Sequence, residues 1–289
     1  MRGKREWVDE TINEDAGFRT FYEAVGGIRM VDSTQDLAVF QNPTFGKMMI
    51  LDGAVQVTER DEFIYHEMMA HVALFAHGAV RRVLIVGGGD GGIAREVLRH
   101  RAVASITLVE IDGAVVDLCR AEFPAISAGA FDDPRLRVVI ADGAAFVAGT
   151  EDRFDVIIVD SPDPVGPGAV LFQPPFYRAC KAALAPGGLM VTQSGMPFLT
   201  PGWFASHAET LRTVFPAREF FLSTVPSYTG GPMAHGLLPA EPAAATPALE
   251  TLATRYAAAG IATRYYTPEI HRAAFALPPY IGTLATGTA

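Results

Sequence analysis

From residue 81 onward the chain alternates short apolar segments with longer segments of helical period. The apolar segments are 83–87, 105–112, 136–142, 154–160, 188–195 and 220–228. Strands this uniformly apolar are typical of a parallel sheet that is covered on both faces. Helices are expected after the first glycine-rich turn, to about residue 100, and then over 114–123, 175–184 and 203–214. The alternation predicts an α/β fold with a mostly parallel sheet.

The first sixty residues show strand patterns instead. An alternating segment at 54–58 follows Asp52-Gly53, a dipeptide typical of tight hairpin turns. Residues 61–75 then change to a helical period with one buried side. We therefore expect a small N-terminal β-strand domain over 1–60 and a larger α/β domain over 61–289.

Two segments near the C-terminal end have patterns of their own. Residues 239–247, PAEPAAATP, are of low complexity and are expected to form a surface loop. Residues 265–277 are expected to form a strand followed by a short helix.

Composition and charge narrow the class of protein. The 289 residues are 49% hydrophobic, which is ample for a buried core, and the two cysteines allow neither a disulfide framework nor a Cys-based metal site. No apolar run could span a bilayer, and the N-terminus lacks a signal peptide, so a cytoplasmic protein is expected. The net charge of −9, without a Lys/Arg run, disfavours nucleic acid and anionic membranes as partners. An acidic field favours a cationic substrate, although solubility is by itself the better explanation of the charge.

Acidic residues follow four successive predicted strands. They are Asp90 in the turn 87–92, Glu110, Asp142 and Asp160. In open parallel sheets the ligand binds beyond the carboxyl ends of the strands. Carboxylates at four matching positions in the topology therefore indicate a binding site at this edge.

The glycine-rich turn allows two interpretations. Gly87, Gly89 and Gly92 fit the dinucleotide pattern GxGxxG, with Glu110 about eighteen residues further on and able to bind ribose hydroxyls in either case. In a dinucleotide site a pyrophosphate would rest on this turn, where Asp90 would repel it. The turn therefore favours a cationic ligand without phosphate, such as S-adenosylmethionine or a relative. Asp142 is then placed to accept a hydrogen bond from an adenine amino group.

A second pair of carboxylates, Asp160 and Asp163, lies on a proline-rich loop that suits an amine substrate. A carboxylate can bind an alkylammonium ion, whose pKa is near 10, and then take its proton as the nitrogen attacks. The alternative is a proline-rich turn with helix-capping aspartates. Tyr65 is a candidate second amine ligand, although packing is the commoner role of such a tyrosine. His66 and His71 are spaced i, i+5 and diverge on a helix, which argues against a zinc site.

Taken together, these motifs resemble the spermidine synthases, the polyamine aminopropyltransferases, and the bacterial ones in particular. The matching segments are 51–53, 58–63, 65–68, 87–92, 109–112, 132–135, 160–168, 226–228, 264–266 and 270–275. The resemblance implies a Rossmann-like, methyltransferase-type sheet with a small N-terminal β-domain. It also implies a cytoplasmic homodimer or homotetramer with no metal and no tightly bound cofactor.

The activity that the resemblance implies is transfer of an aminopropyl group. Decarboxylated S-adenosylmethionine would be the co-substrate and putrescine the acceptor, giving spermidine and methylthioadenosine. The donor-binding residues implied are Gln35, Gly87, Gly89, Asp90, Glu110, Asp142 and Gly143. The catalytic residues implied are Asp160 as the base, with Tyr65, Asp163 and Tyr228. The acceptor region would be lined by Gln56, His66, Asp90, Asp163 and Tyr228. The decarboxylated donor ends in an ammonium group and lacks the carboxylate, so Asp90 would also select against S-adenosylmethionine itself.

Some positions depart from the family pattern. Pro162 stands where a hydroxyl residue is usual, and Thr229 where bacterial members often have an aromatic one. These departures leave the acceptor open, with cadaverine, agmatine and spermidine as alternatives to putrescine. Two other classes also stay open. One is a small-molecule methyltransferase that uses S-adenosylmethionine, and the other is a non-catalytic nucleoside- or polyamine-binding protein.

Overall fold

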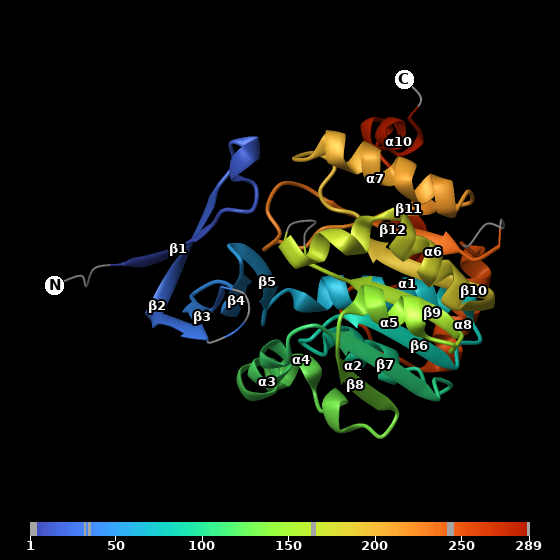
Figure 1. Ribbon diagram of the computed structural model, residues 1–289, viewed down its shortest axis with the longest axis horizontal. Helices are drawn as coiled ribbons and strands as arrows, with labels where there is room; N and C mark the ends of the chain where they lie inside the picture. The colour runs from blue at the N-terminus through green and yellow to red at the C-terminus, as the bar shows by residue number, and fades with distance from the viewer. Residues whose placement is uncertain (1–4, 32, 34–35, 163–165, 242–245, 288–289) are drawn as a thin grey trace.

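The computed structural model describes residues 5–31, 33, 36–162, 166–241 and 246–287, and their strands form two sheets (Figure 1). The smaller sheet has the order β1-β2-β3-β4-β5, with every neighbouring pair antiparallel. Its strands are β1 Glu6–Glu10, β2 Thr20–Val31, β3 Leu37–Asn42, β4 Gly46–Leu51 and β5 Ala54–Thr58. The predicted hairpin turn joins β4 and β5, with φ positive at both Asp52 (49°) and Gly53 (76°), as a tight hairpin turn requires.

The larger sheet has the order β11-β12-β10-β9-β6-β7-β8. Its strands are β6 Arg82–Gly87, β7 Ser105–Glu110, β8 Leu136–Ile140, β9 Phe154–Asp160, β10 Leu184–Gln193, β11 Glu219–Ser223 and β12 Met233–Pro239. The five from β10 to β8 are mutually parallel, and β12 is antiparallel to both of its neighbours. The predicted α/β fold with a mostly parallel sheet and an N-terminal β-sheet is thereby confirmed. The expected domain boundary after residue 60 lies in the turn between β5 and the first helix.

Helices cover both faces of the larger sheet. They are α1 Glu62–His77, α2 Gly92–Leu98, α3 Gly113–Glu122, α4 Pro124–Ser127, α5 Gly143–Gly149, α6 Pro174–Ala183, α7 Pro201–Val214, α8 Leu249–Ala259, α9 Pro268–Ala274 and α10 Pro279–Thr286. Short 3-10 helices occur at Glu14–Ala16, Ala130–Asp132 and Gly166–Phe172. Alternate residues of the strands face two cores, as a sheet buried on both sides requires: Val83 and Ile85 pack with α1, and Leu84 and Val86 with α6 and α7. None of the helices in the described part of the chain is long and apolar enough to cross a membrane.

Helix α1 differs from its expected pattern, since it is buried almost along its whole length and not on one side. The helix packs against β9 and β10 on the sheet, while α2 and α8 cover it from other directions. Such a position needs apolar residues all around the helix. It also buries the polar residues Glu62, His66, Glu67 and His71, each of which therefore needs a partner.

Other corrections concern the last third of the chain. No strand forms at the start of 265–277, because three consecutive backbone N–H groups, of 264–266, donate to the Glu67 carboxylate at 2.8 Å each and form no ladder. The predicted strand 220–228 ends at Ser223. Strand β12 lies where the sequence indicated no element. The expected loop 239–247 begins at the last residue of β12, and its residues 242–245 lie outside the described part of the chain.

Candidate active site

A cavity of about 470 Å³ lies at the carboxyl ends of β6, β7 and β9, where the N-terminal sheet faces them. Strands β6 and β9 are neighbours from which the chain proceeds to opposite sides of the sheet, so this edge is a topological switch point. Eleven expected site residues line the cavity: Gln56, Tyr65, His66, Gly87, Gly89, Asp90, Glu110, Asp142, Gly143, Asp160 and Tyr228. The other two, Gln35 and Asp163, lie outside the described residues.

The glycine-rich turn has no room for side chains at two of its positions. Gly87 pairs with Asp160 in the ladder, and its φ of +83° is one that other residues rarely adopt. A Cβ at Gly87 would lie 1.9 Å from the Asp160 carbonyl oxygen, and one at Gly89 would lie 3.0 Å from Glu110 Oε2. These glycines allow the backbone and the carboxylates to border one cavity.

Glu110 and Asp142 occupy the ends of neighbouring strands. Glu110 is buried and accepts a hydrogen bond from the Asp112 N–H at 3.1 Å, and burial raises the pKa of its carboxyl. Asp142 is exposed and caps α5, accepting from the Ala145 N–H at 3.0 Å. A carboxylate has about four acceptor positions, so this cap leaves room for a ligand.

Both carboxylate oxygens of Asp90 have partners inside the protein. One oxygen accepts from the Gly92 N–H at 2.7 Å, and the other lies 3.2 Å from His66 Nε2. The opposite ring nitrogen of His66 lies 2.6 Å from Glu62 Oε2. Burial alone would lower the pKa of His66, but Asp90 and Glu62 outweigh it and raise the pKa to about 10. Burial would likewise raise the pKa of Asp90, and His66 reverses this to a net lowering.

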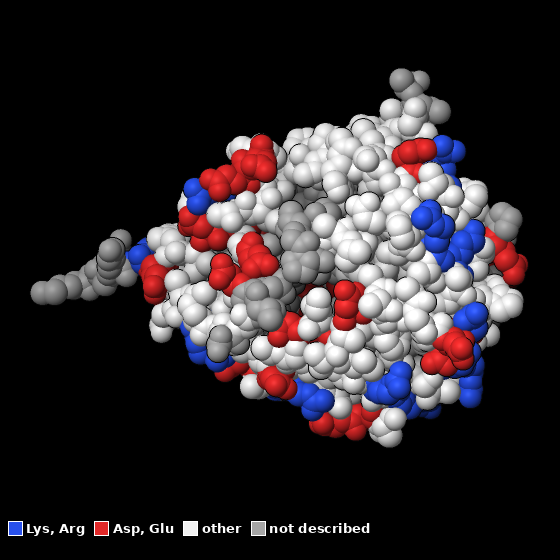
Figure 2. All heavy atoms as spheres, viewed as in Figure 1, with Lys and Arg blue, Asp and Glu red and all other residues white. Residues whose placement is uncertain are grey.

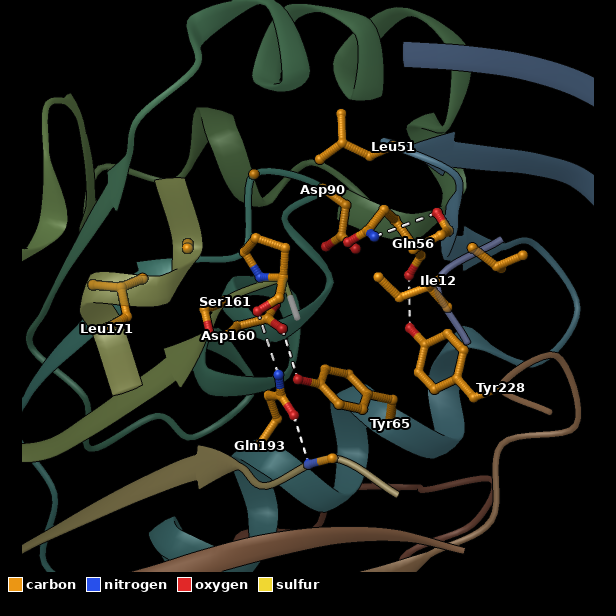
Figure 3. Close-up of a pocket in the computed structure, with 18 of the residues that line it drawn as sticks. Ile12, Leu51, Gln56, Tyr65, Asp90, Asp160, Ser161, Leu171, Gln193 and Tyr228 are labelled. Carbon is orange, nitrogen blue, oxygen red and sulfur yellow. Dashed lines mark hydrogen bonds between the residues drawn. The ribbon is translucent and has the colours of Figure 1, made fainter. Parts of the chain in front are cut away.

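Asp160 projects into the cavity opposite Asp90 and is bound to Tyr65 (Figure 3). The Tyr65 hydroxyl donates to Asp160 Oδ1 at 2.7 Å. Burial, followed by repulsion from Asp90, raises the pKa of Asp160 to about 7, although His66 and the Tyr65 hydrogen bond oppose the rise. Burial and the Asp160 charge raise the pKa of Tyr65, which keeps its hydroxyl a donor. A carboxyl group that titrates near neutral pH is well suited to general-base catalysis.

Tyr228 connects the N-terminal sheet to Tyr65. Its hydroxyl donates to the Gln56 carbonyl at 2.6 Å, and its ring lies edge-on to Tyr65 with 5.9 Å between centroids. The neighbouring Thr229 also reaches the N-terminal sheet, with its Oγ1 2.9 Å from that of Thr20. The position that departs from the family pattern is thus a contact between the two sheets.

Two buried polar residues of the cavity were missed in the sequence. Glu10, at the end of β1, accepts from the Val55 N–H at 3.2 Å and the Tyr22 hydroxyl at 3.4 Å. Gln193 ends β10, where its amide donates to the Pro162 carbonyl at 3.4 Å and accepts from the Gly195 N–H at 2.8 Å. The rule that indicated the four carboxylates would also have pointed to Gln193, which lies near the end of the predicted strand 188–195. No local signal marks Glu10.

Comparison with known proteins decides which family this site represents. The family model described as the spermine/spermidine synthase domain matches residues 62–244, and that of the spermidine synthase tetramerisation domain matches 30–59. The chain belongs to the spermine/spermidine synthase family. It is accordingly an aminopropyltransferase enzyme of polyamine biosynthesis, as the sequence motifs predicted.

Relatives of this family match most of the chain. A polyamine aminopropyltransferase of Ruegeria sp. (strain TM1040) is 53% identical over 250 residues, covering 86% of this chain and 88% of the relative. Polyamine aminopropyltransferase 1 of Pseudomonas aeruginosa is 53% identical over 247 residues, which are 86% of each chain. A crystal structure of spermidine synthase in complex with the transition state analogue AdoDATO has a TM-score of 0.89 at 34% identity, covering 100% of this chain and 97% of the other. A crystal structure of spermidine synthase from Thermotoga maritima has a TM-score of 0.85 at 33% identity, covering 99% of this chain and 95% of the other.

Proposed function

We propose that this enzyme transfers the aminopropyl group of decarboxylated S-adenosylmethionine to putrescine, giving spermidine and methylthioadenosine. The observation that carries the proposal is Asp160, a half-buried carboxyl group at the switch point whose pKa is raised to about 7. The AdoDATO complex of the related spermidine synthase supports a donor of this class.

The donor half of the cavity suits an adenosyl sulfonium compound. Glu110 would accept hydrogen bonds from the ribose hydroxyls, and Asp142, beside Gly143, would accept one from the adenine amino group. On the face shown in Figure 2, acidic side chains border the hollow between the N-terminal sheet and the rest of the molecule. A field of this sign attracts a donor with two positive charges and repels phosphate. The donor role of Gln35 stays a prediction.

The acceptor would enter as an ammonium ion and lose one proton to Asp160. The freed nitrogen lone pair then attacks the carbon next to the sulfonium, the new N–C bond forms, and the C–S bond breaks. Its electron pair returns to sulfur, which becomes the neutral thioether of methylthioadenosine. Because the leaving group is already activated, the enzyme has to supply alignment and deprotonation. Tyr65 supports both by holding Asp160 through its 2.7 Å hydrogen bond. The help expected from Asp163 and Tyr228 stays a prediction.

Glu10 supports a diamine as the acceptor. It is a buried carboxylate that the N-terminal sheet contributes to the same cavity as Asp160. A diamine carries a second ammonium group, and a carboxylate at that group would favour it over a monoamine. Putrescine, cadaverine and spermidine fit this chemistry and differ in length, and agmatine carries a guanidinium group in place of the second ammonium.

We also propose that the enzyme is a homodimer or homotetramer. The match of residues 30–59 to the tetramerisation domain supports an assembly through the N-terminal sheet. Exposed apolar residues lie on the first two strands of that sheet: Trp7, Phe21, Val25 and Met30. Light scattering on the purified protein tests the proposal, and a monomer at micromolar concentration would contradict it.

The decisive experiment is a screen of amines with decarboxylated S-adenosylmethionine, with the products identified by mass. Spermidine from putrescine together with methylthioadenosine is the expected result, and a better yield from a longer amine would change the acceptor. A methylated amine with S-adenosylhomocysteine, made from S-adenosylmethionine, would contradict aminopropyl transfer. Tight binding of methylthioadenosine without turnover of any amine would indicate a binding protein.

A further inference from the structure

A chain of buried charges runs from the cavity into the protein behind it. It starts at Asp90, passes through His66 and Glu62, and ends at Arg95 on α2. The three ion pairs have N–O distances of 3.2 Å (Asp90–His66), 2.6 Å (His66–Glu62) and 2.9 Å (Glu62–Arg95). Asp90 and His66 line the cavity, whereas Glu62 and Arg95 line a separate hollow of about 580 Å³.

The contacts of His66 determine its charge. Each ring nitrogen lies within hydrogen-bonding distance of a carboxylate oxygen, and an ionised carboxylate only accepts hydrogen bonds. With both carboxylates ionised, both nitrogens carry a proton, which makes His66 an imidazolium ion. Its side chain is buried, so water does not screen this charge.

The surrounding helices hold this arrangement in place. The Arg95 guanidinium donates to both Glu62 oxygens, at 2.9 and 3.2 Å, and to the Ile126 carbonyl at 2.6 Å. A Cβ at Gly92 would lie 2.2 Å from His66 Nδ1, so glycine at this position lets the ring pack against the start of α2.

The charge of His66 acts on two carboxyl groups that face one cavity. Asp90 and Asp160 repel each other, and two such neighbours tend to share a single proton. An imidazolium bound to Asp90 favours the ionised form of that carboxylate, which directs the proton to Asp160. Separating two carboxyl groups in this way assigns binding to one and base catalysis to the other.

We propose that Glu62, held by Arg95, is a positioning residue that keeps His66 an imidazolium, so that Asp90 stays ionised and Asp160 is the group that exchanges a proton. The proposal rests on the proposed function, because it assigns the amine-binding and base roles to these two aspartates. The charged and titratable groups around His66 are Glu62, Tyr65, Asp90, Arg95 and Asp160.

The charge of His66 can be measured in the wild-type enzyme without any assay of activity. The seven histidines are labelled with ¹⁵N, and the His66 signals are assigned by their loss in His66→Gln. Both ring nitrogens are expected to stay protonated between about pH 6 and about pH 9, far above the ordinary pKa near 6.5. A neutral His66 ring at about pH 7.5 would overturn the proposal.

Glu62→Gln tests the positioning role. The change keeps the shape and removes the charge, so His66 is expected to lose its second proton at lower pH than in the wild type. In this variant we expect His66 to be neutral near pH 7, which leaves less positive charge near Asp160. The acid limb of kcat/KM should then move upward by about half a unit to one unit, which lowers the rate about three- to tenfold at pH 7. At high pH the rate should return to within about threefold of wild type, because Asp160 is then ionised in both enzymes.

Two variants separate this effect from simple damage to the fold. Glu62→Asp keeps the charge and should retain the wild-type pH profile. Glu96→Gln removes another buried carboxylate that also pairs with Arg95, at 2.7 Å, but whose histidine partner is His71. It should leave the His66 signals and the pH profile unchanged even if the Tm falls. An equal shift in Glu96→Gln, or no shift in Glu62→Gln, would refute the positioning role. If no amine is aminopropylated at all, the proposed function fails. The measurement of the His66 ring nitrogens still shows whether His66 is an imidazolium ion.

Discussion

Replacing Asp160 with asparagine tests the central step of the proposed reaction. Asparagine has nearly the same shape and can still accept the Tyr65 hydrogen bond, but it cannot take a proton from the acceptor amine. The loss of a general base costs about 10²- to 10⁴-fold in rate, so kcat should fall by that factor. Donor binding should largely survive, because the adenosyl contacts of Glu110 and Asp142 are unchanged.

The same substitution has a pH signature. Asp160 must be ionised to act as the base, and its pKa is raised to about 7, so wild-type kcat/KM should rise with pH and level off above about 7. This acid limb should be absent in Asp160→Asn. The raised pKa also means that the folded protein binds more protons than the unfolded chain between about pH 4 and pH 7. The contribution of Asp160 to stability is therefore present at low pH and is lost as the pH rises through about 7. At pH 8 the asparagine variant should be at least as stable as the wild type.

The assay combines steady-state turnover from about pH 5.5 to pH 9.5 with calorimetric binding of methylthioadenosine and a thermal melt of both proteins. Turnover within about threefold of wild type would remove Asp160 from the base role, since the predicted loss is about 10²-fold or more. A wild-type acid limb near pH 4 would contradict the raised pKa. A large fall in Tm at pH 8 would show that the carboxylate stabilises the fold, contrary to the direction argued from its burial.

Three further changes test the surrounding site. Tyr65→Phe removes the hydrogen bond that lowers the pKa of Asp160, so the acid limb of the pH–rate profile should move above pH 7. The value of kcat should fall about tenfold, which is what a hydrogen bond to a charged group contributes. An acid limb that stays in place would contradict this prediction. Asp90→Asn should raise the KM for decarboxylated S-adenosylmethionine about 10- to 100-fold and weaken the binding of S-adenosylmethionine less. If calorimetry shows that the affinities for the two compounds fall equally, selection by charge is refuted. Gly87→Ala places a Cβ 1.9 Å from the Asp160 carbonyl at a φ of +83°. The free energy of unfolding in urea should therefore fall by more than about 2 kcal/mol. An unchanged unfolding midpoint would refute the close approach.

Local patterns in the sequence determined much of the fold. Strands β6, β7, β9 and β10 lie on predicted apolar segments, because a strand buried on both faces must be apolar throughout. The edge strand β8 also lies on such a segment, although it is only partly buried. Eleven of the thirteen expected site residues line one cavity, since parallel strands present their carboxyl ends at the same edge. The family followed from the same motifs, as the matches to 30–59 and 62–244 confirm.

Only the tertiary structure decided which residues are partners across long separations in the chain. Tyr228 donates to a carbonyl group 172 residues away, and Glu67 binds the backbone near 264, which replaces the strand expected there. Glu10 reaches the cavity only because the N-terminal sheet packs beside the strand ends. The environment of Asp90 is a further example, because its ion pair with His66, whose other ring nitrogen faces Glu62, follows from the packing of α1 beside the glycine-rich turn. Periodicity and spacing report which face of an element is buried, whereas the charge state of a buried group depends on the few atoms packed against it.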